Sequence, residues 1–277
     1  MLLGLAKGKV GDLVFYRDGG EQRTRTRVIP KNPRSEAQMA QRVRLANVPA
    51  FYRVMQAIMK DSFSNRPSNQ SGYNAFARGA IEISPFLTKE MAIAGSVLPA
   101  PYMVSRGVIS PLPYGVASVE GGGAPELPLV VSGDTPTTVG GWSQLILSAY
   151  PQLQEGDILT FIGVSFSVEE FGDSLDIHKA SASTYQLELN SASEVAVSSS
   201  EITSLPSGIV PVLRTATENV AVAIVASRKL ADGTLQTSTA ALVLDDVAQT
   251  LYESYRTEQS LSEAIESYGR GEESILR

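Results

Sequence analysis

The chain of 277 residues is 43% hydrophobic and 19% charged, with 23 glycines, 15 prolines and a formal net charge of −6. This is the composition of an ordered globular protein, long enough for one large domain or two ordinary ones. It has no cysteine and one histidine, His178, which excludes disulfides, thiolate metal sites, cysteine nucleophiles and sites built from several imidazoles. No apolar run approaches the roughly 18 residues that span a bilayer, and Met1–Ala6 is too short for a signal-peptide core. We therefore expect a soluble, non-secreted protein with no membrane partner.

The charge divides between the two ends of the chain. Residues 1–110 carry 16 Lys and Arg against 7 Asp and Glu, a net charge of +9, whereas residues 111–277 carry 7 against 22, a net charge of −15. Such a bipolar distribution suits nucleic acid at the basic end, or head-to-tail contact between copies of the chain.

The first predicted element is a basic β-hairpin arm over residues 1–33. Asp18-Gly19-Gly20 between two β-prone runs is typical of a hairpin turn, since glycine adopts positive φ readily. In the second run Arg23, Arg25 and Arg27 occupy every second position, so their side chains share one face at spacings of about 6.5–7 Å. The hairpin has too little apolar surface to be stable alone, and we expect it to dock on a neighbour.

Residues 34–84 are predicted to form a small helical segment. Ser35 opens a capping box that starts the first helix, and Pro49 is expected to kink this helix or to start a second one. After a polar loop, another short helix is expected from Gly72 to about residue 83. Residues 85–136 are rich in Pro and Gly and are predicted to be an extended connector.

Residues 137–245 are predicted to form a mainly antiparallel β-sandwich of the Ig-like kind, because about seven short β-prone runs are separated by turn signals. An Asp232-Gly233 turn is expected between the last two strands. Residues 246–277 are predicted to be an acidic C-terminal helix. The predicted fold class is thus α+β. The expected strands are 127–131, 144–149, 158–167, 185–189, 195–198, 220–227 and 237–244.

None of the candidate chemical motifs is complete. Gly4-Leu-Ala-Lys-Gly8-Lys9 has three residues between its glycines where a phosphate-binding loop has four, and Val10 follows where Ser or Thr is needed. The four carboxylates between Glu169 and Asp176 lack the spacing of a calcium loop and are expected to form a solvated loop. His178 has no adjoining nucleophile motif and is expected at the surface or at a strand end. Trp142 is expected to anchor the core.

From these motifs we predict no catalytic residue, no cofactor, no metal ligand and no enzymatic activity. A carbohydrate-directed enzyme is the weakest of the alternatives, because nothing in the sequence selects a pair of catalytic carboxylates from the 22 acids of the second half.

The arginine ladder, meaning Arg23, Arg25 and Arg27, is the strongest local signal. Its guanidinium groups suit bidentate contact with carboxylates of another copy or partner, contact with nucleic-acid phosphates, or simple solvation on an exposed face. We favour the protein contact, because DNA binding requires many neutralised phosphates at once and the chain as a whole is acidic. The predicted protein-interface residues are Arg23, Arg25, Arg27, Arg34, Arg42 and Arg44.

Three segments carry a family resemblance: Gly8-Lys-Val-Gly-Asp-Leu-Val-Phe-Tyr16, the Asn-Pro-Arg-Ser-Glu-Ala-Gln element that follows Lys31, and Asn74-Ala-Phe76. They resemble an uncharacterised family of proteins encoded by Bacteroidetes genomes and their tailed phages, crAss-like phages among them. Asp12 stands where Asn is usual in that family, and Ser35 stands where Thr is common.

The resemblance covers about residues 4–80 and 220–244 and carries over no functional residue. It implies a phage virion structural protein, most simply an oligomeric tail or neck ring or adaptor subunit bound through its basic N-terminal arm. Capsid decoration is a variant of this function. The expected partners are other copies and other virion proteins, and the expected location is the virion, after synthesis in the bacterial host cytoplasm. The alternative is a nucleic-acid-binding protein packaged with the phage genome or acting on it.

Overall fold

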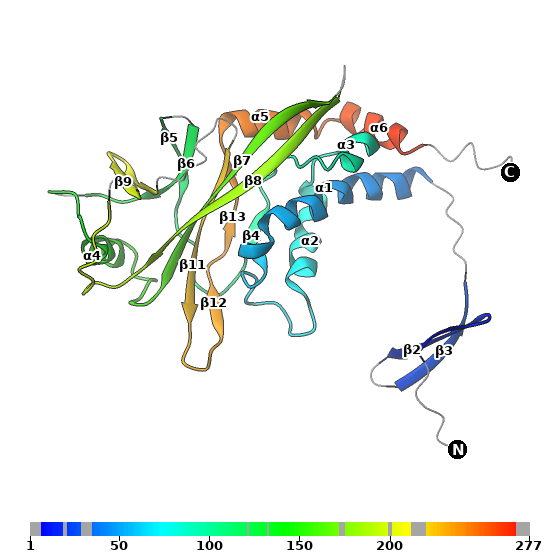
Figure 1. Cartoon of the computed structure of the whole chain (residues 1–277), viewed down its shortest axis with the longest axis horizontal. Helices are drawn as coiled ribbons and strands as arrows, with labels where there is room; N and C mark the ends of the chain where they lie inside the picture. The colour runs from blue at the N-terminus through cyan, green and yellow to red at the C-terminus, as the bar shows by residue number, and fades with distance from the viewer. Residues whose placement is uncertain are drawn as a thin grey trace. The chain divides into compact units, whose positions relative to one another are not determined.

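The structure is a computed structural model that describes residues 7–18, 21–28, 35–120, 122–131, 133–171, 175–198, 201–211 and 220–269. Six helices and mainly antiparallel sheets make up the described residues (Figure 1), so the expected mixture of helices and antiparallel strands is confirmed. The chain divides into an N-terminal unit, which contains the described residues 7–28, and a main unit, Glu36–Arg270.

The N-terminal unit is a three-stranded antiparallel sheet. Its strands are β1 (Gly8–Val10), β2 (Leu13–Asp18) and β3 (Glu21–Thr26), in that order across the sheet. The predicted turn glycines at 19 and 20 lie outside the described residues. Val14 and Phe15 are half-buried, and every other residue of this sheet whose exposure is described is exposed.

The first helix of the main unit, α1 (Glu36–Met59), starts directly after Ser35 as predicted and runs through Pro49. The separate second helix expected there does not form. A proline inside a helix removes one hydrogen bond and costs about 3 kcal/mol. Burial of Val48, Phe51 and Met55, all fully buried around the proline, offsets this cost at about 1.5–3 kcal/mol each.

The helix α2 (Gly72–Ile83) matches its prediction and begins at the N-cap Ser71, whose side chain accepts a hydrogen bond from the N–H of Asn74. A short helix, α3 (Lys89–Ile93), follows it. The strand β4 (Met103–Ser105) then pairs with the late strand β13 (Ala240–Ala241).

A central antiparallel sheet has the order β12-β11-β7-β8, and β14 also pairs with β11. Its strands are β7 (Ile158–Phe171), β8 (Leu175–Glu188), β11 (Val220–Lys229), β12 (Leu235–Thr237) and β14 (Val243–Leu244). The pairing of β7 with β8 is unbroken along all 14 residues of each strand.

The strands expected at 158–167 and 220–227 are confirmed, and so is the Asp232-Gly233 turn, where Gly233 has φ of +83°. The single strand expected over 237–244 is instead broken into pieces. Ser238 accepts hydrogen bonds from two different segments: its Oγ accepts from the N–H of Ala226, and its carbonyl oxygen accepts from Ser105 Oγ. Such side-chain hydrogen bonds compete with a regular ladder.

A second antiparallel sheet has the order β5-β6-β10-β9. Its strands are β5 (Gly115–Val119), β6 (Gly122–Pro128), β9 (Ile202–Leu205) and β10 (Gly208–Pro211). The strand expected over 127–131 is therefore shifted toward the N-terminus. The strand expected over 195–198 is reduced to one isolated bridge, between Thr138 and Ala196.

The segment predicted as a strand over 144–149 is part of a helix, α4 (Val139–Ala149), and that prediction is wrong. The N-cap Thr138 accepts a hydrogen bond from the N–H of Gly141, which starts the helix. Trp142 and Ile146, four residues apart, are buried on one side of it. The helical period is hidden in the sequence by the apolar run that surrounds Ile146.

The predicted C-terminal helix is two helices, α5 (Asp246–Ser254) and α6 (Glu258–Ser267). Each has its own N-cap: Asp245 accepts from the N–H of Ala248, and Thr257 accepts from the N–H of Ser260. The backbone of Thr257 is extended, so the first helix cannot continue through it and a second helix begins after it.

The central sheet is buried on both faces. On one face, Ile162 and Val164 of β7 pack in a core cluster with Phe51 of α1 and Phe76 of α2. On the other face, Phe161 packs in a second cluster that contains Trp142 of α4 and residues of the second sheet. Figure 1 shows α1 and α2 on one side of β7, β8 and β11, with α4, β5 and β6 on the other.

Candidate functional site

The N-terminal sheet has two chemically different faces, which follow from its register. The pairs of Val14 with Arg25 and of Tyr16 with Arg23 place one set of side chains together, and the pairs of Leu13 with Thr26 and Val10 with Leu13 place the other set on the opposite side. The basic face consists of Lys9, Val14, Tyr16, Glu21, Arg23 and Arg25, so a carboxylate lies among its three cations. The apolar face consists of Val10, Leu13, Phe15, Gln22, Thr24 and Thr26, with Arg17 at its end.

Two side-chain contacts of the arginine ladder lie within its own sheet. Arg23 lies 3.6 Å from the carboxylate of Glu21, and the two side chains are 53% and 78% exposed. The guanidinium carbon of Arg25 lies 5.8 Å from the centre of the Tyr16 ring. Arg27 follows β3 and donates its backbone N–H to the carbonyl of Asp12. The side chains of Arg23, Arg25 and Arg27 are all exposed to solvent.

The remaining predicted interface residues do not belong to the described N-terminal sheet. Arg34 lies outside the described residues. Arg42 and Arg44 belong to α1 in the main unit, where Arg42 is exposed and Arg44 is half-buried. The described part of the predicted interface is therefore divided between two units of the chain, with Arg23, Arg25 and Arg27 in the N-terminal unit and Arg42 and Arg44 on α1 of the main unit.

The acidic stretch from Glu169 to Asp176 is not the open loop that the sequence predicted. Glu169 lies in β7 and Asp176 in β8, two strands of one hairpin whose residues 172–174 lie outside the described part. Within the described part of the chain, no group of three or more His, Asp or Glu side chains is placed to hold a metal ion.

His178 is buried inside β8, so the prediction of a surface or strand-end histidine is wrong. Its backbone N–H donates to Ser96 Oγ, and its Nε2 lies 3.3 Å from the hydroxyl of Tyr255. Its Nδ1 is buried and has no hydrogen-bond partner among the described residues. Burial lowers the pKa of His178 below 6.5, and the carboxylate of Asp176 opposes this shift. The imidazole of His178 packs edge-on against the ring of Tyr255, with 5.7 Å between the ring centres.

Two other singled-out motifs have structural places. Trp142 is 1% exposed in the core, as expected, and its Nε1 has no partner among the described residues. Gly8 and Lys9 lie in β1 rather than in a loop that leads into a helix, so the geometry of a phosphate-binding loop is absent at these described positions.

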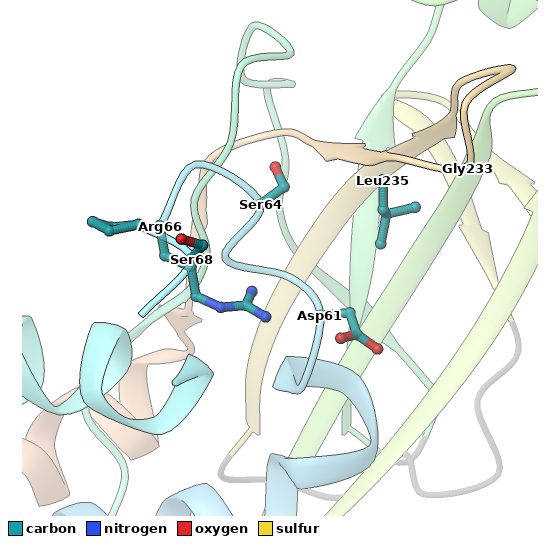
Figure 2. Close-up of a pocket in the computed structure, with 7 residues that line it drawn as sticks. Asp61, Ser64, Arg66, Ser68, Gly233 and Leu235 are labelled. Atoms are coloured by element: carbon teal, nitrogen blue, oxygen red, sulfur yellow. The ribbon is translucent and has the colours of Figure 1, made fainter. Parts of the chain in front are cut away.

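A polar pocket of about 480 Å³, which sequence reasoning missed, lies between the loop after α1 and the β11–β12 turn. Figure 2 shows Asp61, Ser64 and Arg66 on the loop, opposite Gly233 on the turn and Leu235 at the start of β12. Arg66 donates to the carbonyls of Phe63 and Gln70, so its guanidinium holds the loop together.

No sequence signal could have identified this pocket, because its two walls lie far apart in the chain. The hydrogen bond that joins them, between Ser64 Oγ and Thr237 Oγ1, spans 173 residues. A second cleft, of about 250 Å³, adjoins it between the end of α1 and the face of the central sheet. Asp61, Ser62, Ile58, Thr160, Thr184 and Gln186 are among its lining residues.

Comparisons of the chain with protein-family models, with curated proteins and with solved structures gave no match. Among the described residues, no helix has the length and apolar character needed to cross a membrane.

Proposed function

We propose that the protein is a phage virion structural protein, an oligomeric tail or neck ring or adaptor subunit that joins its neighbour through the N-terminal sheet. The observation that carries the proposal is that this sheet has an apolar face and a basic face but buries no described residue of its own. The resemblance of residues 4–80 to the phage-encoded family supports the same function.

The exposed apolar side chains give the sheet a reason to bind another surface. Val10 is 67% exposed, Leu13 is 46% exposed and Val28, just after β3, is 74% exposed. A small sheet without a core gains stability only by packing on something else. Burial of apolar surface contributes about 25 cal/mol per Å², so docking would stabilise both the contact and the sheet.

The basic face gives this contact its direction. Arg23 and Arg25 present two guanidinium groups from one side of the sheet, and the second half of the chain carries a net charge of −15. Opposite charges on the two ends of one molecule favour head-to-tail association, and such heterologous contact closes into a ring when the rotation between copies allows it.

We further infer that the N-terminal sheet acts as an arm and that the two larger sheets form a β-sandwich. The second inference is supported by the core cluster that Phe161 of β7 and Ile224 of β11 share with Leu127 of β6 and Ile209 of β10. The Ig-like topology stays a prediction.

The alternative function, binding of nucleic acid packaged with the genome, is favoured by one observation. Lys9, Arg23 and Arg25 lie on one face of the sheet together with Tyr16, and exposed cations beside an aromatic ring suit a phosphate backbone and a stacked base.

The assembly of the purified protein, followed by sedimentation velocity over a concentration series, tests the proposal. The triple variant Arg23→Ala, Arg25→Ala, Arg27→Ala should assemble more weakly by at least about tenfold, because interfacial charge pairs cost about 2–5 kcal/mol when broken. A matched control removes three exposed cations from the main unit, Arg53, Lys60 and Arg106, and should assemble like the wild type.

Two results would contradict the proposal. One is a wild-type protein that stays monomeric at all concentrations and is absent from purified phage particles by mass spectrometry. The other is normal assembly of the triple variant together with salt-sensitive DNA binding by the wild type at about 150 mM salt, which would instead support the nucleic-acid function.

A further inference from the structure

Among the described residues, hydrogen bonds from other elements reach the outer edge of β8 only near its start. The carbonyl of His178 accepts from the N–H of Val97, and its N–H donates to Ser96 Oγ. Lys179 adds a side-chain hydrogen bond to the carbonyl of Ala94. In an antiparallel strand the N–H and C=O of one residue point to the same side, and the side alternates along the chain. The backbone groups of His178 therefore point away from β7.

The same alternation fixes which later residues of β8 point outward. Because the register with β7 is unbroken, the N–H and C=O groups of Ala180, Ala182, Thr184 and Gln186 point away from β7, as those of His178 do. In the described part of the chain, no hydrogen bond from another element reaches these four pairs of backbone groups. Residues 180–186 thus form an edge with free donors and acceptors at every second position.

This edge also lacks the features that usually block strand pairing. Residues 180–186 contain no proline and no charged side chain, and the strand shows no bulge. The opposite edge of the central sheet is formed by β12 and β14, which are only three and two residues long. An edge as long and uncharged as that of β8 is suited to receive another strand.

The N-terminal sheet carries a matching edge. The N–H of Arg27 donates to the carbonyl of Asp12, so the backbone groups of the odd-numbered residues of β3 point toward β2. Those of Gln22, Thr24 and Thr26 consequently point outward, since β3 is the last strand of its sheet. Both edges therefore offer pairs of free N–H and C=O groups at two-residue spacing.

We propose that β3 of one copy pairs antiparallel with the outer edge of β8 of a second copy, joining the N-terminal sheet to the central sheet. This rests on the proposed function, and it names the surface that receives the N-terminal sheet. With Thr24 opposite an outward residue such as Thr184, the two sheets form one continuous ladder.

The faces of the two sheets then match in chemistry. Residues directly opposite in an antiparallel pair have side chains on the same face. The apolar face of the incoming sheet therefore continues the α1-covered face of the central sheet, where the cleft of about 250 Å³ lies beside Thr184 and Gln186 next to the half-buried Ile58. That face is the one that gives Leu13 and Phe15 an apolar neighbour.

The basic face falls on the opposite side, which carries Tyr185. Burial raises the pKa of Tyr185, and the carboxylate of Glu201 adds to the rise, which places that negative charge near this side of β8. The arrangement also keeps Arg23 and Arg25 away from α1, a helix with three arginines and one glutamate. The direction of the outward backbone groups and the distribution of charge thus favour the same orientation of β3 against β8.

Proline substitutions at the two edges test the pairing without breaking either sheet. Thr184→Pro and Thr24→Pro each remove an outward N–H and leave the hydrogen bonds to β7 or β2 in place. Thr184→Val and Thr24→Val are the matched controls, because they keep the N–H and the branched shape. In sedimentation velocity, each proline variant should assemble about tenfold more weakly or worse, and each valine variant should match the wild type.

A lysine variant tests the same edge in case the proline variants fail to fold. Thr184 is exposed, so Thr184→Lys places a charge at the edge without disturbing the core, and it should weaken assembly in the same direction. The melting temperature of every variant is measured alongside to show that it is folded.

The outcomes separate this inference from the proposed function. Assembly of folded Thr184→Pro and Thr184→Lys chains at the wild-type level would overturn the β8 pairing, and the proposed function would stand if the triple arginine variant were still defective. Normal assembly of Thr24→Pro with defective Thr184→Pro would overturn β3 as the incoming strand. Normal assembly of the triple arginine variant, together with salt-sensitive DNA binding by the wild type, would overturn the proposed function itself.

Discussion

Replacing Arg228 by Met should destabilise the main unit by several kcal/mol, because it leaves a buried carboxylate without its partner. Arg228 of β11 donates from Nε and from one terminal nitrogen to the two carboxylate oxygens of Asp157, both at 2.7 Å. The Asp157 side chain is 0% exposed and that of Arg228 is 19% exposed. The same guanidinium donates to the carbonyl of Gln152, so it joins the turn before β7 to β11.

The magnitude follows from the burial of the pair. Removing one partner of a buried ion pair costs about 3–5 kcal/mol, whereas an exposed pair is worth about 0.2–1 kcal/mol. For a unit of this size each kcal/mol lowers the melting temperature by roughly 2–4 °C, so the expected drop is roughly 6–20 °C. Arg228→Lys should lie between the variant and the wild type, because lysine keeps the charge and loses the two-pronged geometry.

Thermal unfolding followed by circular dichroism, with urea unfolding to obtain the free energy, measures the effect. Arg53→Met is the matched control, since it removes an exposed arginine from α1 of the same unit and should change stability by about 0.5 kcal/mol or less. A loss from Arg228→Met no larger than that of the control would refute the reasoning that the buried carboxylate depends on this partner.

Three further predictions concern single positions. Because burial lowers the pKa of His178 below 6.5, the folded chain binds fewer protons than the unfolded chain at acidic pH. The free energy of unfolding should therefore be highest above about pH 6.5 and fall below it. The variant His178→Gln should reduce this fall in urea unfolding measured at several pH values. Thr138→Ala removes the N-cap of α4 and should cost about 1 kcal/mol in urea unfolding, with Thr138→Ser close to the wild type. Gly79→Ala adds a Cβ to α2 in open space and should stabilise the main unit by about 0.5–1 kcal/mol. Gly140→Ala adds a Cβ to α4 at 2.5 Å from a backbone carbonyl oxygen and should lower the melting temperature. Equal effects of the two variants would contradict the contact argument.

Elements of the fold could be predicted from the sequence where a local signal agrees with the final packing. Ser35 and the capping box mark the start of α1, the Asp232-Gly233 pair marks a tight turn, and the apolar run of Val220 to Ser227 marks a strand buried on both faces. In each case a few neighbouring residues carry the information, and the tertiary structure does not override it.

Other elements depend on partners that are distant in the chain. The middle of β8 reads Ala-Ser-Ala-Ser, a stretch without large apolar side chains, and it becomes part of a strand because the whole length of β7 pairs with β8. His178 is buried because that register turns it toward Ser96 and Tyr255, which lie 82 and 77 residues away. The alternating arginines of β3 were visible in the sequence, whereas the apolar face behind them appears only once β1 is paired with β2.

In the main unit, the helix α1 is synthesised long before the strand that covers its apolar face. The stripe of α1 that contains Phe51, Met55 and Met59 is covered by a sheet whose strand β11 is made about 170 residues later. At roughly 5–20 residues per second, this stripe leaves the ribosome roughly 9–34 s before its covering strand exists. During that interval the apolar face of this helix is exposed to solvent on the nascent chain. Holdase chaperones that bind such helices should therefore raise the yield of native protein, and a circular permutant that places β11 ahead of α1 should need them less.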